Sequence, residues 1–259
     1  MNHATVHDAV ITGAASGIGL DCCGDLLERG WRVFALDRAS GELAGARERF
    51  REAADRFVPI ECDVSDASSV ATAFERIGAM TSSVDALICS AGIFRTGSLL
   101  AMAESDFDAV FAVNTRGAWL TARAALPLLE QAARPDAPAR IVFVASAAAL
   151  RPKAGGGAYA ASKVALTYIA RVLAVELADT GILVNAVAPA TVDTPMTRKL
   201  SADAAHSGYT VSGVSPLGRV AQPADVTSVI GFLRSPGANY RAGAVLPIDG
   251  GTTAAFQPK

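Results

Sequence analysis

The stretch Thr12-Gly13-Ala14-Ala15-Ser16-Gly17-Ile18-Gly19 separates a short apolar run, residues 9–12, from a helical pattern that begins near Gly17. Glycines let the backbone turn tightly here and approach a pyrophosphate, whose charge the helix N-terminus attracts. A glycine-rich turn alone is weak evidence, because ordinary strand-to-helix connections contain the same residues. Its position after the first predicted strand favours dinucleotide binding, with candidate residues Gly13, Ser16, Gly17, Ile18 and Gly19.

Asp37 ends the second apolar run, residues 33–37, and lies eighteen residues beyond Gly19. Dinucleotide-binding folds place a carboxylate at this point on the adenosine ribose, where it would repel a 2′-phosphate. The small Ser16 in the glycine turn offers no positive charge to such a phosphate. We therefore expect NAD rather than NADP. Arg38 leaves alternatives, because it could stack on adenine, permit some NADP binding or be an ordinary solvated arginine.

Seven short apolar runs, including the two described above, alternate with helical patterns along the chain. Runs of this length, nearly free of charge, are typical of strands whose sheet is covered by helices on both faces. The pattern predicts an α/β chain: a single-domain, doubly wound Rossmann fold with a seven-stranded parallel sheet. Expected helices include residues 17–29, 65–78 and 158–178; the expected strands are residues 9–12, 33–37, 57–62, 86–89, 141–146, 183–188 and 244–248.

The composition indicates a small-molecule partner. Among 259 residues, 23 Lys+Arg face 25 Asp+Glu, so no charge excess would recruit nucleic acid or an anionic membrane. We expect one domain over residues 1–259, no signal peptide and no apolar stretch long enough to span a membrane. The three scattered histidines, His3, His7 and His206, predict no metal site. Cysteines without C-x-x-C spacing, at 22, 23, 62 and 89, favour a cytoplasmic protein.

Residues 190–215 differ from the rest of the chain, because they are polar, turn-rich and interrupted by Pro195, Gly208 and Gly213. Long segments of this kind in a compact domain often cover a binding site. We expect a substrate lid here, with residues 196–214 as the part that closes.

Tyr159 and Lys163 stand four residues apart at the head of a helical pattern, thirteen residues after Ser146. Residues at this spacing project from one helix face, so the ammonium could lower the pKa of the phenol and ready it for proton exchange. The Tyr-x-x-x-Lys pattern alone is common in helices. Together with the glycine turn, it predicts acid–base chemistry beside a dinucleotide.

Along nearly its whole length the chain resembles the short-chain dehydrogenase/reductase family. The resemblance rests on an ordered set of motifs: TGAASGIG at 12–19, Asp63-Val64, Ser90-Ala91-Gly92, Asn114, Ser146, Tyr159-x-x-x-Lys163, Pro189 and Asp249-Gly250-Gly251. It implies an enzyme that moves a hydride between NAD(H) and a secondary alcohol or ketone.

The resemblance also implies roles. Tyr159 would be the general acid/base, Ser146 a donor to the substrate oxygen, and Lys163 the residue that holds the nicotinamide ribose and lowers the Tyr159 pKa. Asn114 would hold a water between Lys163 and solvent. Further cofactor contacts would come from Asp63, Val64, Ser90, Ala91, Gly92, Pro189, Val192 and Thr194.

Two positions depart from the family pattern. Ser90 replaces an asparagine whose amide braces the centre of the sheet, and Ala190 replaces a glycine after Pro189. A hydroxyl can still form a hydrogen bond at the first position. At the second, a positive φ would cost energy with alanine, so the nicotinamide loop could be displaced.

The local sequence favours a ring-shaped substrate with a carboxylate. Stretches such as AGIFRTGSLL (91–100) and VASAAALRPKAGGGAYAASK (144–163) are similar to dehydrogenases of 2,3-dihydro-2,3-dihydroxybenzoate and related cyclic alcohols. In that interpretation Arg95, Arg151 or Lys153 would pair with the carboxylate. The alternatives are a 3-oxoacyl thioester reductase and a non-catalytic nucleotide sensor. Resemblance further implies a homotetramer built through residues 104–133, residues 158–178 and the last strand.

Overall fold

Seven parallel strands form one sheet in the order β3-β2-β1-β4-β5-β6-β7. The computed structural model describes residues 7–204 and 209–254. Each predicted strand is present, with ends that differ by at most a few residues. The strands are β1 (Asp8–Thr12), β2 (Arg32–Asp37), β3 (Phe57–Glu61), β4 (Ala86–Cys89), β5 (Ala139–Val144), β6 (Ile182–Pro189) and β7 (Val245–Ile248). The strand order reverses between β1 and β4, where doubly wound folds bind their ligands.

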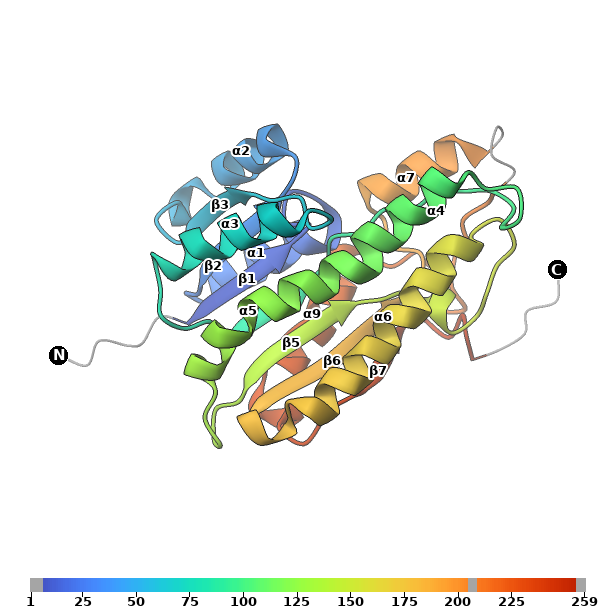
Figure 1. The fold of residues 1–259 in the computed structure, drawn as a ribbon. Helices are drawn as coiled ribbons and strands as arrows, with labels where there is room; N and C mark the ends of the chain where they lie inside the picture. Colours follow the sequence, from blue (N-terminus) through green and yellow to red (C-terminus); the bar gives the residue numbers. More distant parts are fainter. Residues whose placement is uncertain (1–6, 205–208, 255–259) are drawn as a thin grey trace.

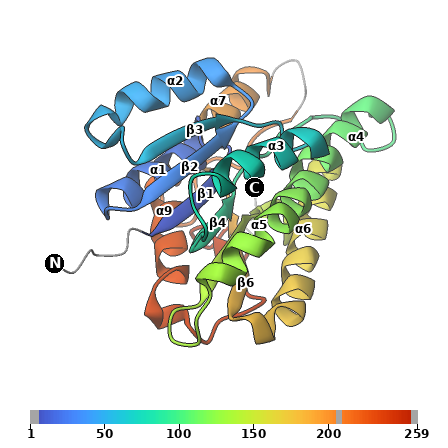
Figure 2. The same ribbon diagram turned by 60° about the vertical axis from the view of Figure 1, so that its left-hand side comes forward.

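Helices cover both faces of the sheet (Figures 1 and 2). On one face lie α3 (Ala67–Gly78), α5 (Ala118–Ala132) and α6 (Gly157–Glu176); on the other lie α1 (Gly17–Glu28), α2 (Ser40–Arg49) and α9 (Pro223–Leu233). Successive strand residues point to opposite faces, so Val10 enters one core and Ile11 the other. This arrangement explains why the strands read as unbroken apolar runs.

The stretch over residues 104–133, which the resemblance places in an assembly interface, is helical with an irregular turn. It consists of α4 (Glu104–Phe111), the π-helical segment η2 (Ala112–Gly117) and α5. Val110 is fully buried, whereas Phe107 is 38% exposed and its ring stacks on Phe111 with centroids 4.7 Å apart. Single π-helical turns inside helices are frequent at functional sites, and this one carries Asn114.

Helix α3 begins later than predicted, at Ala67 rather than residue 65. Its N-cap is Asp66, whose carboxylate accepts a hydrogen bond from the Ser68 amide at 2.9 Å. A capping carboxylate stabilises the first turn because it satisfies an orphan N–H group. The remaining short elements are η1 (Arg51–Ala53), η3 (Ala147–Ala149), η4 (Ala178–Thr180), α7 (Pro195–Ala202) and η5 (Pro236–Ala238).

Helix α6 corrects one expectation, namely that no apolar stretch is long enough to span a membrane. By length and composition alone, its 20 residues would be able to cross one. The helix nonetheless packs in the core, where Leu166, Ala170 and Ala174 are buried against the sheet. Core helices pass the same test of length and hydropathy, so the feature is weak evidence for a membrane span.

Candidate functional site

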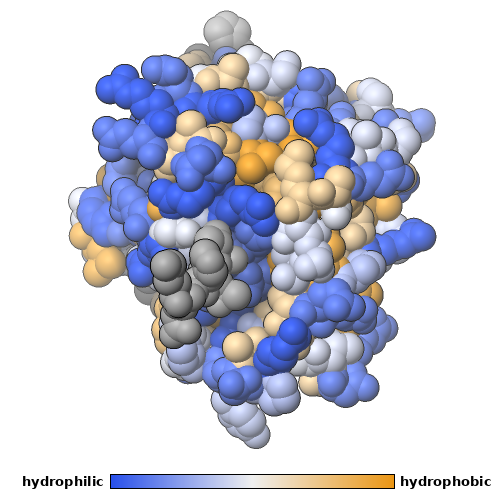
Figure 3. All heavy atoms as spheres, turned by 90° about the vertical axis from the view of Figure 1, so that its left-hand side faces the viewer, coloured by the Kyte–Doolittle hydropathy of each residue, from blue (hydrophilic) through white to orange (hydrophobic). Residues whose placement is uncertain are grey.

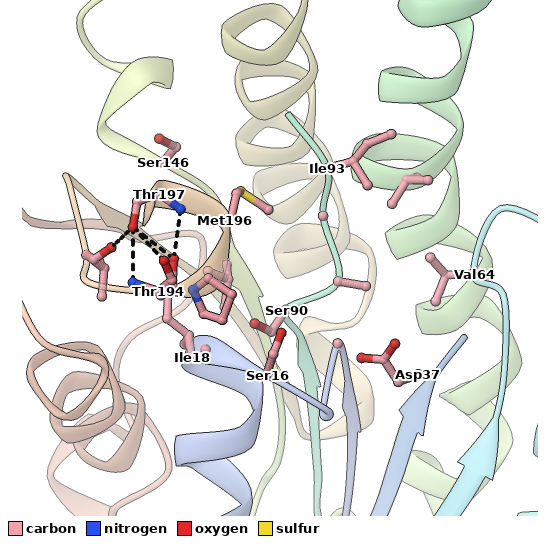
Figure 4. A pocket seen from close by; sticks show the side chains of 18 of the residues that line it. Ser16, Ile18, Asp37, Val64, Ser90, Ile93, Ser146, Thr194, Met196 and Thr197 are labelled. Atoms are coloured by element: carbon pink, nitrogen blue, oxygen red, sulfur yellow. Dashed lines mark hydrogen bonds between the residues drawn. The ribbon is translucent and has the colours of Figure 1, made fainter. Parts of the chain in front are cut away.

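A cavity of about 330 Å³ opens at the carboxyl ends of the strands, around the reversal between β1 and β4. Figure 4 shows Asp37 and Val64 on one side, Ser146 on the other, and Ser16 and Ser90 between them. The structure brings together every predicted site residue except Gly19 and Asn114, which lie behind the wall. The predicted residues that line the cavity are Gly13, Ser16, Gly17, Ile18, Asp37, Arg38, Asp63, Val64, Ser90, Ala91, Gly92, Ser146, Tyr159, Lys163, Pro189, Val192 and Thr194.

The glycine turn is built by close approaches that exclude a Cβ atom. At Gly13, with φ +67°, a Cβ would lie 2.8 Å from the Ala91 nitrogen; at Gly19 it would lie 2.1 Å from the Gly13 oxygen. Both distances are too short for any larger residue without a backbone shift. The glycines therefore give a bare backbone surface at the N-terminus of α1, as a pyrophosphate requires.

Asp37 connects the second strand to this turn. One carboxylate oxygen accepts a hydrogen bond from the Ala15 amide and the other from the Ala39 amide, both at 3.1 Å. These contacts fix the carboxylate at the cavity edge. Nearby, Asp63 accepts hydrogen bonds from the amide and hydroxyl of Ser65, at 2.9 and 2.6 Å. Asp63 thus shapes the loop after β3, while Asp66 caps α3.

Thr12 provides the bracing at the sheet centre that was expected from position 90. Its hydroxyl oxygen accepts hydrogen bonds from the amides of Ser90 and Ala91, at 3.1 and 3.2 Å. These bonds join the ends of β1 and β4 across the strand reversal. The Ser90 side chain instead lies at the cavity wall.

Asn114 joins three elements and is fully buried. Its amide nitrogen donates to the Ile93 carbonyl at 3.0 Å and to the Ser162 hydroxyl at 3.1 Å, while its amide oxygen accepts from the Ile93 amide at 2.8 Å. Both amide N–H groups and one lone pair of the amide oxygen therefore have protein partners. Its direct effect is to hold the segment after β4 against η2 and α6.

Tyr159 and Lys163 lie on α6, and Ser146 lies two residues after the end of β5, as the N-cap of η3. Lys163 is only 3% exposed, and its ammonium donates to the Val144 carbonyl at 2.8 Å. The ammonium nitrogen lies 5.8 Å from the centre of the Tyr159 ring. Gly92 lies beside this ammonium: a Cβ there would make an ordinary contact with the Lys163 nitrogen at 3.5 Å and a tighter one with the Asn114 amide oxygen at 3.3 Å.

Burial controls the ionisation of both groups. It raises the pKa of Tyr159 to about 12, although the hydrogen bond with Ser146 acts in the opposite direction. It also lowers the pKa of Lys163 to about 8. Removal from water disfavours the charged form of each group, so a phenol becomes a weaker acid and an ammonium a stronger one. The raised Tyr159 pKa is opposite to the depression expected from the Lys163 spacing alone.

The loop after β6 keeps ordinary backbone geometry. Among the described residues no residue other than glycine has a positive φ, so the strain considered for Ala190 does not occur. Val192 is buried and pairs with Ala221. Thr194 and Thr197 form a capping box at the start of α7, and the Thr197 hydroxyl also donates to the Val192 carbonyl at 2.5 Å (Figure 4).

A second cavity, of about 400 Å³, continues from the first past Ser146 and Tyr159. Arg151 and Lys153 contribute to its wall together with aromatic and aliphatic side chains. Arg95 does not line it; its guanidinium pairs with Asp106 at 3.1 Å. Of the three alternative partners for a substrate carboxylate, Arg151 and Lys153 therefore line this cavity and Arg95 does not.

The described residues contain no group of three or more His, Cys, Asp or Glu side chains arranged to hold a metal ion. His7 contacts Asp85 at 2.9 Å and stacks on Trp31. His3 and His206 lie outside the described residues.

Comparison with known sequences shows the family to which the chain belongs. The model of a family described as "Enoyl-(Acyl carrier protein) reductase" matches residues 13–253. The chain belongs to the short-chain dehydrogenase/reductase family. Family membership makes it a nicotinamide-dependent oxidoreductase that interconverts a secondary alcohol and a ketone.

Three relatives show the range of the family near this chain. A cis-4-hydroxycyclohexanecarboxylate dehydrogenase of Sinomonas cyclohexanicum is 37% identical, covering 95% of this chain and 96% of its own. The 3-oxoacyl-[acyl-carrier-protein] reductase FabG of Thermotoga maritima is 34% identical, with 93% and 96% covered. A 3-ketoacyl-(acyl-carrier-protein) reductase from Brucella melitensis, solved with NADH, is 28% identical, has a TM-score of 0.83 and is matched over 95% and 98%.

Four residues that line the cavities were not predicted individually. Met196 and Thr197 line the first cavity, and Phe94 and Tyr209 the second; all but Phe94 belong to residues 196–214, the segment expected to close over the substrate. Phe94 is the second residue after the motif at 90–92, and a search for apolar residues beside the motifs would have found it. Tyr209 carries no such signal, because its position depends on how the segment after α7 returns to the site.

Proposed function

We propose that the protein oxidises a carboxylate-bearing cyclic secondary alcohol with NAD. The observation that carries this proposal is the continuous cavity that runs from the glycine turn and Asp37, past Tyr159, to a mixed apolar and basic chamber. The cofactor would occupy the first part and the substrate the second. The described chamber favours an organic anion, since Arg151 and Lys153 contribute to an otherwise largely apolar and hydroxyl-bearing wall.

The first part of the cavity fits a nicotinamide dinucleotide. Gly13 and Gly19 leave a bare backbone where a pyrophosphate would sit, and Asp37 fits a ribose with a free 2′-hydroxyl. The Asp37 carboxylate would repel a 2′-phosphate, which supports NAD, while Arg38 at the same edge would limit the preference. When bound, the cofactor supplies hydride-transfer chemistry. Asp63, Val64, Pro189, Val192 and Thr194 would complete its site.

Tyr159 would serve as the proton donor and acceptor at the substrate oxygen. With its pKa raised to about 12, the phenol holds its proton at neutral pH and can donate it to a ketone oxygen. For alcohol oxidation it must first lose that proton, a step that a cationic Lys163 would favour. Ser146 would donate to the same oxygen and stabilise the charge that develops there.

Asn114 would act on these groups through position. Its amide is occupied by Ile93 and Ser162, so it would hold the wall that faces Lys163. The amide oxygen accepts one hydrogen bond and has a second lone pair, so a water between Lys163 and solvent would find an acceptor there or on the backbone of η2. The predicted relay stays a proposal for Asn114.

The relative from Sinomonas cyclohexanicum supports the substrate class, because the name of that enzyme denotes a carboxylated cyclohexanol. The direct test is steady-state oxidation of cis-4-hydroxycyclohexanecarboxylate with NAD and with NADP. We expect a higher kcat/KM with NAD and a substantial loss of activity towards cyclohexanol, which lacks the carboxylate. Equal activity towards the two alcohols would exclude carboxylate recognition.

A 3-oxoacyl thioester reductase is the second candidate, favoured by the relative from Thermotoga maritima. Asp37 opposes it if the reaction uses NADPH, because of the 2′-phosphate. Arg95 gives it little support, since its guanidinium is paired with Asp106. Reduction of an acetoacetyl thioester with NADPH, faster than oxidation of the cyclic alcohol with NAD, would reverse the order of the two candidates.

We further propose that residues 1–259 act as one domain, with residues 190–215 as the lid, and that four copies assemble through α4, α5, α6 and β7. Along the outer side of α6, Val164, Tyr168, Val172 and Val175 are 40–78% exposed. A stripe of this kind is typical of a helix that packs against a partner. All four cysteines are buried and unpaired, which supports a cytoplasmic location.

A further inference from the structure

Three aromatic rings, one of them that of the proposed catalytic Tyr159, are in contact beside the site. The Phe94 ring lies 4.4 Å from the Tyr159 ring and 4.9 Å from the Tyr209 ring, centroid to centroid. Both pairs are tilted, by 35° and 47°, and their separations are those of attractive aromatic pairs. We call Tyr159, Phe94 and Tyr209 the aromatic column. Its members come from α6, from the segment after β4 and from the segment after α7.

The run of three glycines at 155–157 provides the seat of this column. A Cβ at Gly156 would lie 3.1 Å from Phe94 Cζ and 3.2 Å from Tyr209 Cε2. At Gly155, with φ +81°, it would lie 3.2 Å from Tyr209 Cδ2. Any side chain at these positions would push the rings outward. The glycines therefore allow the two rings to lie directly on the backbone that precedes α6.

Both added rings are fixed by polar contacts. Asn114 holds the backbone of Ile93 on both its amide and carbonyl groups, which anchors Phe94 to the sheet. The Lys153 ammonium lies 5.3 Å from the centre of the Tyr209 ring and donates to the Thr210 carbonyl. A cation at this distance from an aromatic face is attracted by the ring. The column is thus held at the strand end and at the lid.

All three rings line the second cavity. The aliphatic side chains of Leu200, Val211 and Val214 also line it. A cyclic substrate would keep a broad contact with the aromatic wall, whereas a flexible chain would lose more conformational freedom for the same contact. We propose that Phe94 and Tyr209 select a ring-shaped substrate and hold its carbinol carbon beside Tyr159. This inference rests on the proposed function, since it concerns the same substrate site.

Binding of two unreactive acids tests the inference without turnover. Cyclohexanecarboxylate and heptanoate have the same number of carbons and the same carboxylate, and differ in having a ring or a chain. Calorimetry of each acid with the full-length protein at saturating NADH gives a ring-to-chain affinity ratio. We expect the wild-type protein to prefer the ring. Phe94→Leu and Tyr209→Leu should each lower the ratio roughly 3- to 10-fold, as loss of an aromatic contact implies.

Matched variants separate ring recognition from damage to the fold. Tyr209→Phe keeps the ring and should keep the ratio, as should Phe107→Leu, whose ring stacks on Phe111 on α4 and does not line the cavity. Gly156→Ala keeps Phe94 and Tyr209 but adds a Cβ 3.1–3.2 Å from their rings, so it should lower the ratio. Gly45→Ala, where a Cβ would meet nothing within 4 Å, should not. NADH affinity and circular dichroism monitor folding of every variant.

The affinity ratios support or overturn the proposed ring selection. A ring preference that falls in Phe94→Leu, Tyr209→Leu and Gly156→Ala supports selection by the aromatic column. A wild-type protein that binds both acids equally, binds neither at millimolar concentration, or keeps its ratio in all three variants would overturn it. Ring preference without oxidation of cis-4-hydroxycyclohexanecarboxylate would contradict the proposed function alone, and oxidation without ring preference would contradict the column alone.

Discussion

At the residue scale, the phenol of Tyr159 is the group through which we expect the proton to move. Replacing Tyr159 by Phe keeps the ring against Phe94 but removes the exchangeable proton. We predict a loss of turnover of about 100-fold or more, the usual contribution of a positioned acid or base, with NADH affinity unchanged within about two-fold. Steady-state kinetics and NADH titration measure both. Tyr168→Phe, on the exposed side of the same helix, is the control; equal turnover in both variants would remove Tyr159 from the mechanism.

The buried ammonium of Lys163 lowers the free energy of unfolding by an amount that depends on pH. Its pKa is about 8 in the folded chain against an ordinary value of 10.5, so the unfolded chain binds the proton more tightly. Below pH 8 the folded state bears the full cost of a buried ammonium. Between pH 8 and 10.5 it loses the proton first, and the free energy of unfolding rises with pH.

Lys163→Met should abolish that rise and impair turnover. At pH 7 we predict a free energy of unfolding about 2 kcal/mol above wild type, after allowance for the hydrogen bond lost to Val144. Urea unfolding at pH 7 and pH 10 measures the free energy of unfolding and its rise with pH. A variant less stable than wild type at pH 7, with the same pH dependence, would show that the buried ammonium carries no such cost.

At the element scale, the N-terminus of α7 connects the nicotinamide loop to the lid. Thr197→Val removes the hydroxyl that donates to the Val192 carbonyl and takes part in the capping box with Thr194. Loss of a helix cap should loosen α7. We predict a KM for alcohol and cofactor that rises by about 3- to 10-fold, with a smaller change in kcat.

Thr180→Val is the matched control, because the Thr180 hydroxyl in η4 donates to the carbonyl of Leu177, the N-cap of that element, away from the cavity. If both variants changed KM equally, the capping box would have no specific effect on binding.

Elements that depend on local pattern could be predicted from the sequence, and contacts that depend on tertiary packing could not. The glycine turn and the seven strands follow from residue type and periodicity, so they were found with nearly the right ends. The π-helical turn at η2 has no sequence signal that separates it from an α-helix. The rise of the Tyr159 pKa follows from burial, and the pairing of Arg95 with Asp106 follows from the course of a loop; neither can be read from spacing.

At the scale of the whole molecule, the outer faces differ in polarity. The face seen from the side of α2 and β3 in Figure 1 is largely hydrophilic (Figure 3), whereas α6 presents the apolar stripe of Val164, Tyr168, Val172 and Val175. In Figures 1 and 2, α5 lies beside α6, and its Trp119 is 40% exposed. This contrast supports assembly through the α5 and α6 side.

A charge in the stripe should break the proposed assembly. Tyr168 is 67% exposed at the centre of the stripe, and Tyr168→Glu would bury an unpaired carboxylate in the interface. Analytical ultracentrifugation should give a tetramer for the wild-type protein and a smaller species for the variant. Met80→Glu, at an exposed site beyond α3, should remain tetrameric. A monomeric wild-type protein would contradict the assembly directly.

The central claim is that the cavity at the strand reversal binds NAD(H) with Asp37 at its adenosine end. Calorimetric titration of the wild-type protein with NADH and with NADPH tests this claim before any substrate is known. We predict that NADH binds at least about ten-fold more tightly and that Asp37→Ala narrows the difference, because the carboxylate no longer repels a 2′-phosphate. Tighter binding of NADPH by the wild-type protein, or binding of neither dinucleotide, would contradict the account.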